Sequence, residues 1–285
     1  GLDVGHKSTE IDLVTEADLA SERLIVAAIR ARFPDHSILS EEGLGDLETH
    51  AQEAASLWLV DPLDGTVNYA HGFPFWSVSL ALAERGRVVL GVSYDPVGDE
   101  IFWAERGGGA WRQDAASLTK DAASLTKDAA SLTKDAASLT KDEGERIRVS
   151  SAGRLRDALL ATGFAYKRAT LAENNLAEFD AIMPRVQGVR RAGTAVLDLA
   201  YVAAGRLDGY WEMHLNPWDW AAGWLLVEEA GGTVTDLEGN PWSLEKKALV
   251  ASNGPLHDKL LSVLEGARQR RTGRSSPEGR QDDPT

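Results

Sequence analysis

Length, composition and charge limit the classes of protein to which this chain can belong. Its 285 residues suit one large domain or two modest ones, and its hydrophobic (43%) and charged (26%) fractions are ordinary for a globular protein. The net charge of −14 repels nucleic-acid phosphates, and the lack of Cys excludes disulfides and thiolate metal sites. No apolar run reaches the ~18 residues of a membrane span and no signal-peptide pattern opens the chain, so we expect a soluble cytoplasmic protein.

The first half of the chain reads as a helix followed by strands. Apolar residues recur at helical spacing over 18–33, and Pro34 ends the run. The continuous apolar run 57–60 indicates a buried strand that leads directly into Asp61. Further strands, which together indicate an antiparallel meander, are predicted at 75–83, 87–94 and 100–105.

A heptad repeat interrupts the chain after these strands. Residues 114–141 are four copies of Asp-Ala-Ala-Ser-Leu-Thr-Lys, and 146–149 reads as another strand. The repeat is therefore predicted to be inserted at the tip of a connection between strands, where insertions are tolerated best. Two interpretations stay open for it: a projecting helix that self-associates, or a partly disordered arm, which the weak Ala-Leu seam favours.

The second half is predicted to mix helices and short strands. Predicted helices cover 155–161, 171–183, 196–204, 219–230 and 257–264. Predicted strands cover 207–212, 232–236 and 248–252. We expect an N-terminal α+β half over 1–150 with most of the metal ligands and the insertion, a C-terminal α/β half over 151–268 and a disordered tail over 269–285.

Asp61 and Asp64 are the first candidate site residues. Pro62 restricts the backbone between them and Gly65 permits a tight turn, so both carboxylates and the Leu63 carbonyl can face one small volume. Carboxylates held that close repel each other, and a hard cation such as Mg²⁺ removes the repulsion. Taken alone, however, an Asp-Gly pair after a strand is more typical of a hairpin turn.

Neighbouring features add to the metal interpretation. Residues 65–69 can start a short helix whose free N–H groups at Gly65 and Thr66 would bind phosphate oxygens. The adjacent acids Glu41 and Glu42 would alone be read as solvated charges, and Asp219 alone as a helix N-cap. Cation-binding acids beside an anion-binding turn predict a site for a metal-bridged phosphate.

Several ordered motifs together resemble the inositol monophosphatase family. The two signatures are Trp-Leu-Val-Asp-Pro-Leu-Asp-Gly-Thr at 58–66 and Asn-Pro-Trp-Asp at 216–219, and shorter matches lie at 12–18, 40–43, 190–201 and 205–212. The likeness spans residues 7 to about 264 apart from the repeat. The family pattern normally has a helix before the Lys7 region, so we read the chain as a fragment or a shortened form.

The resemblance implies a fold, an activity and a set of roles. The implied fold is an α-β-α-β-α layered sandwich, usually dimeric, and the implied activity is Mg²⁺-dependent hydrolysis of a phosphate monoester, with myo-inositol monophosphate preferred. Glu41, Asp61 and the Leu63 carbonyl would hold one Mg²⁺, and Asp61, Asp64 and Asp219 a second; some members use a third near Glu41.

The remaining implied roles concern water and substrate. Thr66, paired with Asp18, would position and deprotonate the attacking water, which places Asp18, Glu41 and Thr66 in the catalytic set. The implied substrate contacts are Asp64, Gly65, Thr66, Gly193, Thr194, Ala195, Glu212 and Asp219.

Alternatives stay open at this point. Within the fold, the substrate can instead be fructose bisphosphate, histidinol phosphate or a nucleotide 3′-phosphate. From other classes, the chain can be an interaction protein that uses the repeat arm or the Arg-rich tail, or a Ca²⁺-binding structural module, although EF-hand spacing is absent.

Overall fold

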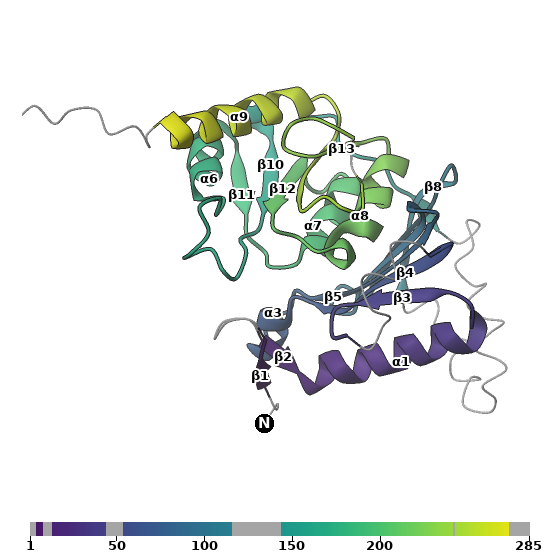
Figure 1. The fold of residues 1–285 in the computed structure, drawn as a ribbon. Coiled ribbons are helices and arrows are strands. Elements are labelled where there is room, and N and C mark those ends of the chain that lie inside the picture. Colours follow the sequence, from purple (N-terminus) through teal and green to yellow (C-terminus); the bar gives the residue numbers. More distant parts are fainter. Residues whose placement is uncertain (1–3, 8–12, 44–53, 116–143, 242, 274–285) are drawn as a thin grey trace, which may run out of the picture.

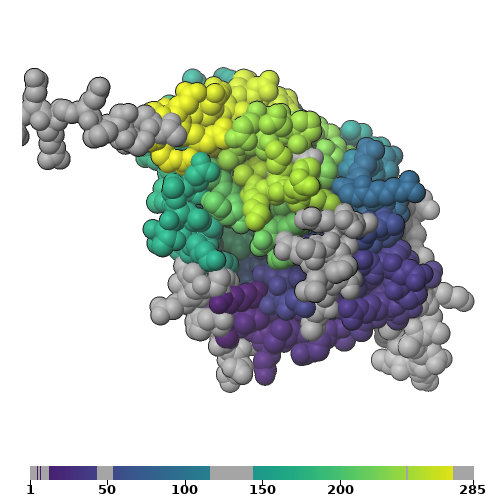
Figure 2. All heavy atoms as spheres, viewed as in Figure 1, coloured from purple at the N-terminus to yellow at the C-terminus, as the bar shows by residue number. Residues whose placement is uncertain are grey.

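The computed structural model describes residues 4–7, 13–43, 54–115, 144–241 and 243–273. Within these residues, helices and sheets alternate in five layers (Figure 1): α1, a first sheet, α7 with α8, a second sheet, and α6 with α9. The predicted α-β-α-β-α sandwich is therefore confirmed. In Figure 2 the C-terminal residues, teal to yellow, lie directly on the N-terminal residues, purple and blue.

The first sheet has seven strands in the described residues, paired in chain order. They are β3 (Ser37–Ser40), β4 (Ser56–Asp64), β5 (Ser77–Glu84), β6 (Arg87–Asp95), β7 (Glu100–Glu105), β8 (Gly109–Asp114) and β9 (Glu145–Arg146). The predicted meander is confirmed because β5, β6 and β7 pair antiparallel, whereas β3 and β4 pair parallel. The strand predicted at 146–149 is wrong beyond Arg146, where pairing to β8 ends.

The heptad repeat begins at the end of β8, the strand next to the edge strand β9 of the first sheet. Because β8 pairs antiparallel with β9, residues 115–144 connect two neighbouring strands, as the sequence predicted. The repeat lies outside the described residues from 116 onward, so neither interpretation of it is tested.

Helix α1 (Glu16–Arg32) forms the outer layer over the first sheet. Its first turn is a capping box. The Thr15 side chain accepts a backbone N–H of the first turn, and the Asp18 side chain accepts the backbone N–H of Thr15. Val26 and Ile29 of the helix pack with Ile38, Trp58 and Val60 of β3 and β4. Strands β1 (Val4–His6) and β2 (Leu13–Thr15) pair antiparallel ahead of this helix.

Helices α7 (Ala195–Ala203) and α8 (Pro217–Glu229) form the central layer between the two sheets. Both are apolar around most of their circumference because both sheets cover them. Leu199 and Trp220 are fully buried there with Phe102 of the first sheet. None of the described helices is long and apolar enough to cross a membrane.

The second sheet has five strands in the described residues, in the order β11-β10-β12-β14-β13. They are β10 (Leu159–Thr162), β11 (Gly188–Arg190), β12 (Gly209–Met213), β13 (Thr233–Thr235) and β14 (Ala248–Ser252). The helix predicted at 155–161 is wrong: only the 3₁₀ turn η3 (Leu155–Asp157) precedes β10. Pairing of β10 with strands on both sides overrides the helix propensity of its Leu and Ala residues.

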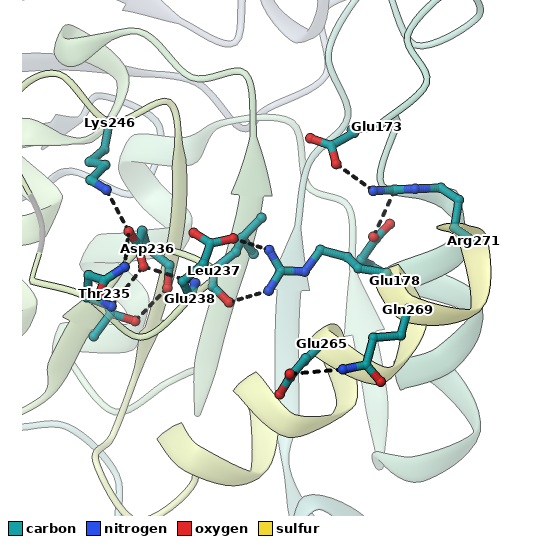
Figure 3. Close-up of polar contacts among 12 residues, drawn as sticks. Glu173, Glu178, Thr235, Asp236, Leu237, Glu238, Lys246, Glu265, Gln269 and Arg271 are labelled. Atoms are coloured by element: carbon teal, nitrogen blue, oxygen red, sulfur yellow. Dashed lines mark hydrogen bonds and ion pairs between the residues drawn. The ribbon is translucent and has the colours of Figure 1, made fainter. Parts of the chain in front are cut away.

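In the outer layer over the second sheet, the start of one helix and the end of another differ from the predictions. Helix α6 (Leu176–Ile182), followed by the 3₁₀ turn η4 (Met183–Arg185), begins later than the helix predicted at 171–183. Helix α9 (His257–Gly273) includes 269–273, so the predicted disordered tail is wrong there, and 274–285 lie outside the described residues. Arg271 in this part of the helix pairs with Glu173 and the buried Glu178 (Figure 3).

Candidate active site

A pocket of about 380 Å³ lies at the carboxyl ends of β3, β4 and β10 and the N-terminal ends of α7 and α8. All but one of the predicted site residues line it. They are Glu41, Asp61, Leu63, Asp64, Gly65, Thr66, Gly193, Thr194, Ala195, Glu212 and Asp219. The exception, Asp18, contacts the pocket through Thr66. The fold thus brings together segments far apart in the sequence.

A β-bulge in β4 lets Asp61 and Asp64 face the same pocket. Side chains alternate along a regular strand, so residues three apart would point to opposite faces. Asp61 pairs with Ser79 and Asp64 with Ser77, which inserts one extra residue into β4 between them. Pro62 lies within this bulge, where a residue without an N–H is tolerated. The hairpin-turn interpretation of this segment is therefore wrong.

Gly65 joins β4 to the short helix α3 (Thr66–Ala70), which was predicted to begin here. Its φ of +95° is strained for any other residue, and a Cβ would lie 3.3 Å from the Phe75 carbonyl and 3.4 Å from that of Gly193. Asn68 of α3 then donates to the carbonyls of Phe75 (2.7 Å) and Ala192 (2.9 Å). These contacts attach the turn to the opposite wall of the pocket.

The Thr66 hydroxyl lies between Asp18 and the pocket. Thr66 Oγ1 is 2.9 Å from Asp18 Oδ1 and 3.2 Å from the Leu63 carbonyl oxygen. Asp18 is fully buried, and its other oxygen accepts the Thr15 N–H at 2.9 Å. When Thr66 donates to Asp18, its oxygen lone pairs are left to accept a hydrogen bond from the pocket side.

Helix N-termini position the two remaining aspartates. Asp64 accepts the Val196 N–H of α7 at 2.8 Å, and Asp219 accepts the Asn216 N–H at 2.7 Å. Asn216 is the N-cap of α8 and Asp219 is its third helical residue, so the prediction of Asp219 as the N-cap is wrong. Free N–H groups at helix starts favour negative charge, which keeps both carboxylates fixed.

Burial and mutual repulsion raise the pKa values of these carboxyl groups. Burial is the largest cause in each case, and it raises the pKa of Asp64 to about 7 and those of Asp61 and Asp219 well above their usual range. The charge of Glu41 raises all three further, and Asp64 acts on the other two. A group of acids that resists ionisation when alone is suited to a bound cation.

Glu41 lies beside Lys7 at the edge of this group. Lys7 Nζ is 2.8 Å from Glu41 Oε1 and also contacts Glu42. No three acidic or histidine side chains of the described segments already have the spacing of a metal-binding group. A side-chain hydrogen bond with Glu41 is among the causes that raise the pKa of Asp61, so these two carboxyl groups lie close together. Their oxygen chemistry fits Mg²⁺, which prefers carboxylate ligands and retains water.

Glu212 lies on the far side of the pocket with partners that sequence reasoning missed. It accepts a hydrogen bond from the Tyr210 hydroxyl, and burial raises its pKa to about 7. Asp198 is buried nearby, and burial followed by the charge of Glu212 raises its pKa well above the usual range. The family-like segment 190–201 contains Asp198, but only the fold shows that it faces Glu212.

The chain is similar to known proteins over most of its length. Nus factor SuhB of Pseudomonas aeruginosa is 42% identical over 256 residues, which cover 89% of this chain and 83% of that protein. Inositol-1-monophosphatase of Synechocystis sp. is 40% identical over 263 residues, covering 92% and 79%. The solved inositol monophosphatase of Anabaena (Nostoc) sp. PCC 7120 aligns with a TM-score of 0.73 at 41% identity, covering 88% of this chain and 86% of that one.

The fold and the acidic pocket, taken with these relatives, define a class of phosphate-ester hydrolases. The pattern described as "Inositol monophosphatase family" matches residues 1–269. The chain belongs to the inositol monophosphatase family, whose members are phosphatases.

Proposed function

We propose that the chain hydrolyses a phosphate monoester with Mg²⁺ at the acidic pocket, and that myo-inositol monophosphate is its preferred substrate. The observation that carries the proposal is the group of buried carboxyl groups that raise one another's pKa beside the Thr66–Asp18 pair. The ligand set proposed from the sequence is Glu41, Asp61, the Leu63 carbonyl, Asp64 and Asp219, with two Mg²⁺ and a weaker third.

The residues of the chain have separate tasks in this reaction. Bound Mg²⁺ would supply water of lowered pKa and positive charge for the phosphoryl oxygens and the departing alkoxide. Thr66 donates a hydrogen bond to Asp18. Its oxygen accepts a hydrogen bond from the attacking water and so orients that water. The start of α7 presents the backbone of Thr194 and Ala195 to the substrate from the opposite wall.

Glu212 supports a polyhydroxylated alcohol as the leaving group. Its carboxylate, when ionised, accepts hydrogen bonds from ring hydroxyls, and the Tyr210 hydroxyl fixes its orientation. The same group would also accept hydrogen bonds from a sugar, so fructose bisphosphate stays an alternative within the fold, beside histidinol phosphate and a nucleotide 3′-phosphate. Two copies per assembly, a cytoplasmic location and the division at residue 150 stay predictions.

Phosphate release tests the proposal directly. We expect Mg²⁺-dependent release from myo-inositol 1-phosphate, its loss in excess chelator and its recovery when Mg²⁺ is restored. Inhibition by Li⁺ is expected in the same assay. Release that persists in chelator would contradict the metal assignment, and release from none of a panel of sugar, histidinol and nucleotide phosphates would contradict the activity.

The stability of the metal-free protein should fall as pH rises. The pKa of Asp64 is about 7 in the folded chain against 3.8 for the ordinary group, so the folded state binds the extra proton between these values. Stability is therefore lost as pH rises through this window, and Mg²⁺ should offset the loss. Thermal melts at about pH 5 and about pH 8, with chelator and with Mg²⁺, test this. An equal increase in melting temperature from Mg²⁺ at both pH values would contradict it.

A further inference from the structure

The glycine at position 163 adjoins the Glu212 side chain where two strands end at the pocket. Strands β10 and β12 lie side by side and pair parallel (Figure 1), and Thr162 is opposite Trp211 at their last paired position. The next residues on the two strands are Gly163 and Glu212, and both line the active-site pocket. The residue at position 163 therefore decides how much room the Glu212 side chain has.

The Glu212 carboxyl group occupies the space that a side chain at position 163 would need. A Cβ at Gly163 would lie nearer than 3.0 Å to both oxygens and to the carboxyl carbon of Glu212, a separation that real structures essentially never show. Tyr210 lies two residues before Glu212 on the same face of β12, and its hydroxyl donates a hydrogen bond to this carboxyl group. Tyr210 thus helps to hold the carboxyl group against the bare backbone of Gly163.

Asn175 holds that backbone in place. Its amide nitrogen donates to the Gly163 carbonyl at 2.7 Å and to the Thr162 hydroxyl at 2.8 Å, and its oxygen accepts the ring N–H of Trp211 at 2.6 Å. The Thr162 hydroxyl in turn donates to the Trp211 carbonyl at 2.6 Å. All three side chains are buried, so a shift of the chain at Gly163 would leave buried polar groups without partners, which is costly.

An alanine at this position would therefore displace the Glu212 carboxyl group rather than the backbone. The φ of Gly163 is not in the left-handed region, so alanine can adopt it without strain. The atoms that its methyl group would meet are the far end of a flexible side chain, which can rotate into another rotamer.

We propose that Gly163 is a specificity-determining residue, because the absence of a side chain there leaves the space from which the Glu212 carboxylate accepts hydroxyl groups of the substrate's alcohol portion. This rests on the role proposed above for Glu212 in the phosphatase reaction. Gly163 acts through Glu212 and is a positioning residue. The proposed metal ligands Asp64 and Asp219 lie on β4 and α8, so replacement of Gly163 should weaken binding of a polyhydroxylated alcohol and leave the chemistry at phosphorus intact.

A double-mutant cycle with myo-inositol 1-phosphate tests whether Gly163 acts through Glu212. Gly163→Ala alone should raise KM roughly tenfold with kcat little changed, because a charge-assisted hydrogen bond made in both the ground state and the transition state is lost. In a Glu212→Ala background, the same replacement should change KM by no more than about twofold, because no carboxylate is left to displace.

The matched control is Gly153→Ala, where a Cβ would meet no atom within 4 Å. Both alanine variants should keep the native melting temperature, and the control should also keep the native KM. An equal rise in KM with and without the Glu212 side chain, or a large fall in the melting temperature of Gly163→Ala, would show that the backbone takes up the strain. Either result would overturn the proposal, as would a native KM in Gly163→Ala.

A crystal structure of the Gly163→Ala variant tests the structural step without an assay. We expect the Glu212 carboxyl group to leave its place beside residue 163, while Asn175 keeps its bonds to residues 162 and 163. A carboxyl group in its native place, or loss of the Asn175 bonds, would overturn the proposal. If the native protein released no phosphate from the inositol ester, the proposed function would fail instead, and the crystal structure would still decide whether Gly163 positions Glu212.

Discussion

Asp64→Asn and Asp219→Asn should each lower Mg²⁺-dependent kcat/KM by roughly 10³-fold, the size of effect seen when one group that stabilises charge in a transition state is removed. Both residues are proposed metal ligands, and they come from different elements, β4 and α8, so neither replaces the other. An amide keeps the shape and the oxygen that accepts the N–H of Val196 or Asn216. Phosphate release at saturating Mg²⁺ measures the loss.

Stability distinguishes loss of chemistry from loss of fold in these variants. Because burial and neighbouring acids raise the pKa values of both groups, a neutral side chain removes a repulsion. Melting temperatures in chelator should therefore be no lower than that of the native chain. The control is Asp180→Asn on the exposed face of α6, which should keep full activity. Near-native turnover in either site variant would rule out the ligand assignment.

Gly91→Ala should destabilise the folded chain by about 1–3 kcal/mol or more, as expected for overpacking against atoms that cannot move aside. A Cβ at Gly91 on β6 would lie 2.9 Å from both the Cα and the carbonyl oxygen of Ala222 in α8. These are backbone atoms of the helix whose first turn carries Asp219. Relief of the clash would displace that helix, so activity should fall together with stability.

Denaturant unfolding measures this effect, with Gly153→Ala as the matched control. A Cβ at Gly153 would meet no atom within 4 Å, and its φ is not in the left-handed region. The control should therefore unfold at nearly the native denaturant concentration. If Gly91→Ala matched the control, the close approach of β6 and α8 would be absent in solution.

The spacing of apolar residues along the sequence predicted most of the elements that are buried on one face, because such burial repeats at regular intervals. The helix over 18–33 and the meander emerged because alternation and 3.6-residue spacing reflect burial directly. The strand β10 did not, because its Leu-Leu-Ala run is buried by neighbours on both sides and has no alternation. The last turns of α9 carry Arg271, which pairs with Glu173 and Glu178, contacts that no local pattern contains.

The acidic side chains of the site could be found from sequence because several motifs occur together. The geometry could not: the bulge that directs Asp61 and Asp64 to one pocket depends on pairing with β5, and the position of Asp219 depends on Asn216 as N-cap.

The proposed metal ligands come from elements that must pack together before a cation can bind all of them. Asp61 and Asp64 come from the first sheet, whereas Asp219 comes from a helix held between the two sheets. An intermediate with one sheet formed would contain only part of the proposed ligand set. Mg²⁺ affinity would then appear late in refolding. The concentration of Mg²⁺ needed to slow unfolding would measure the stability of the packing between the two sheets and α8.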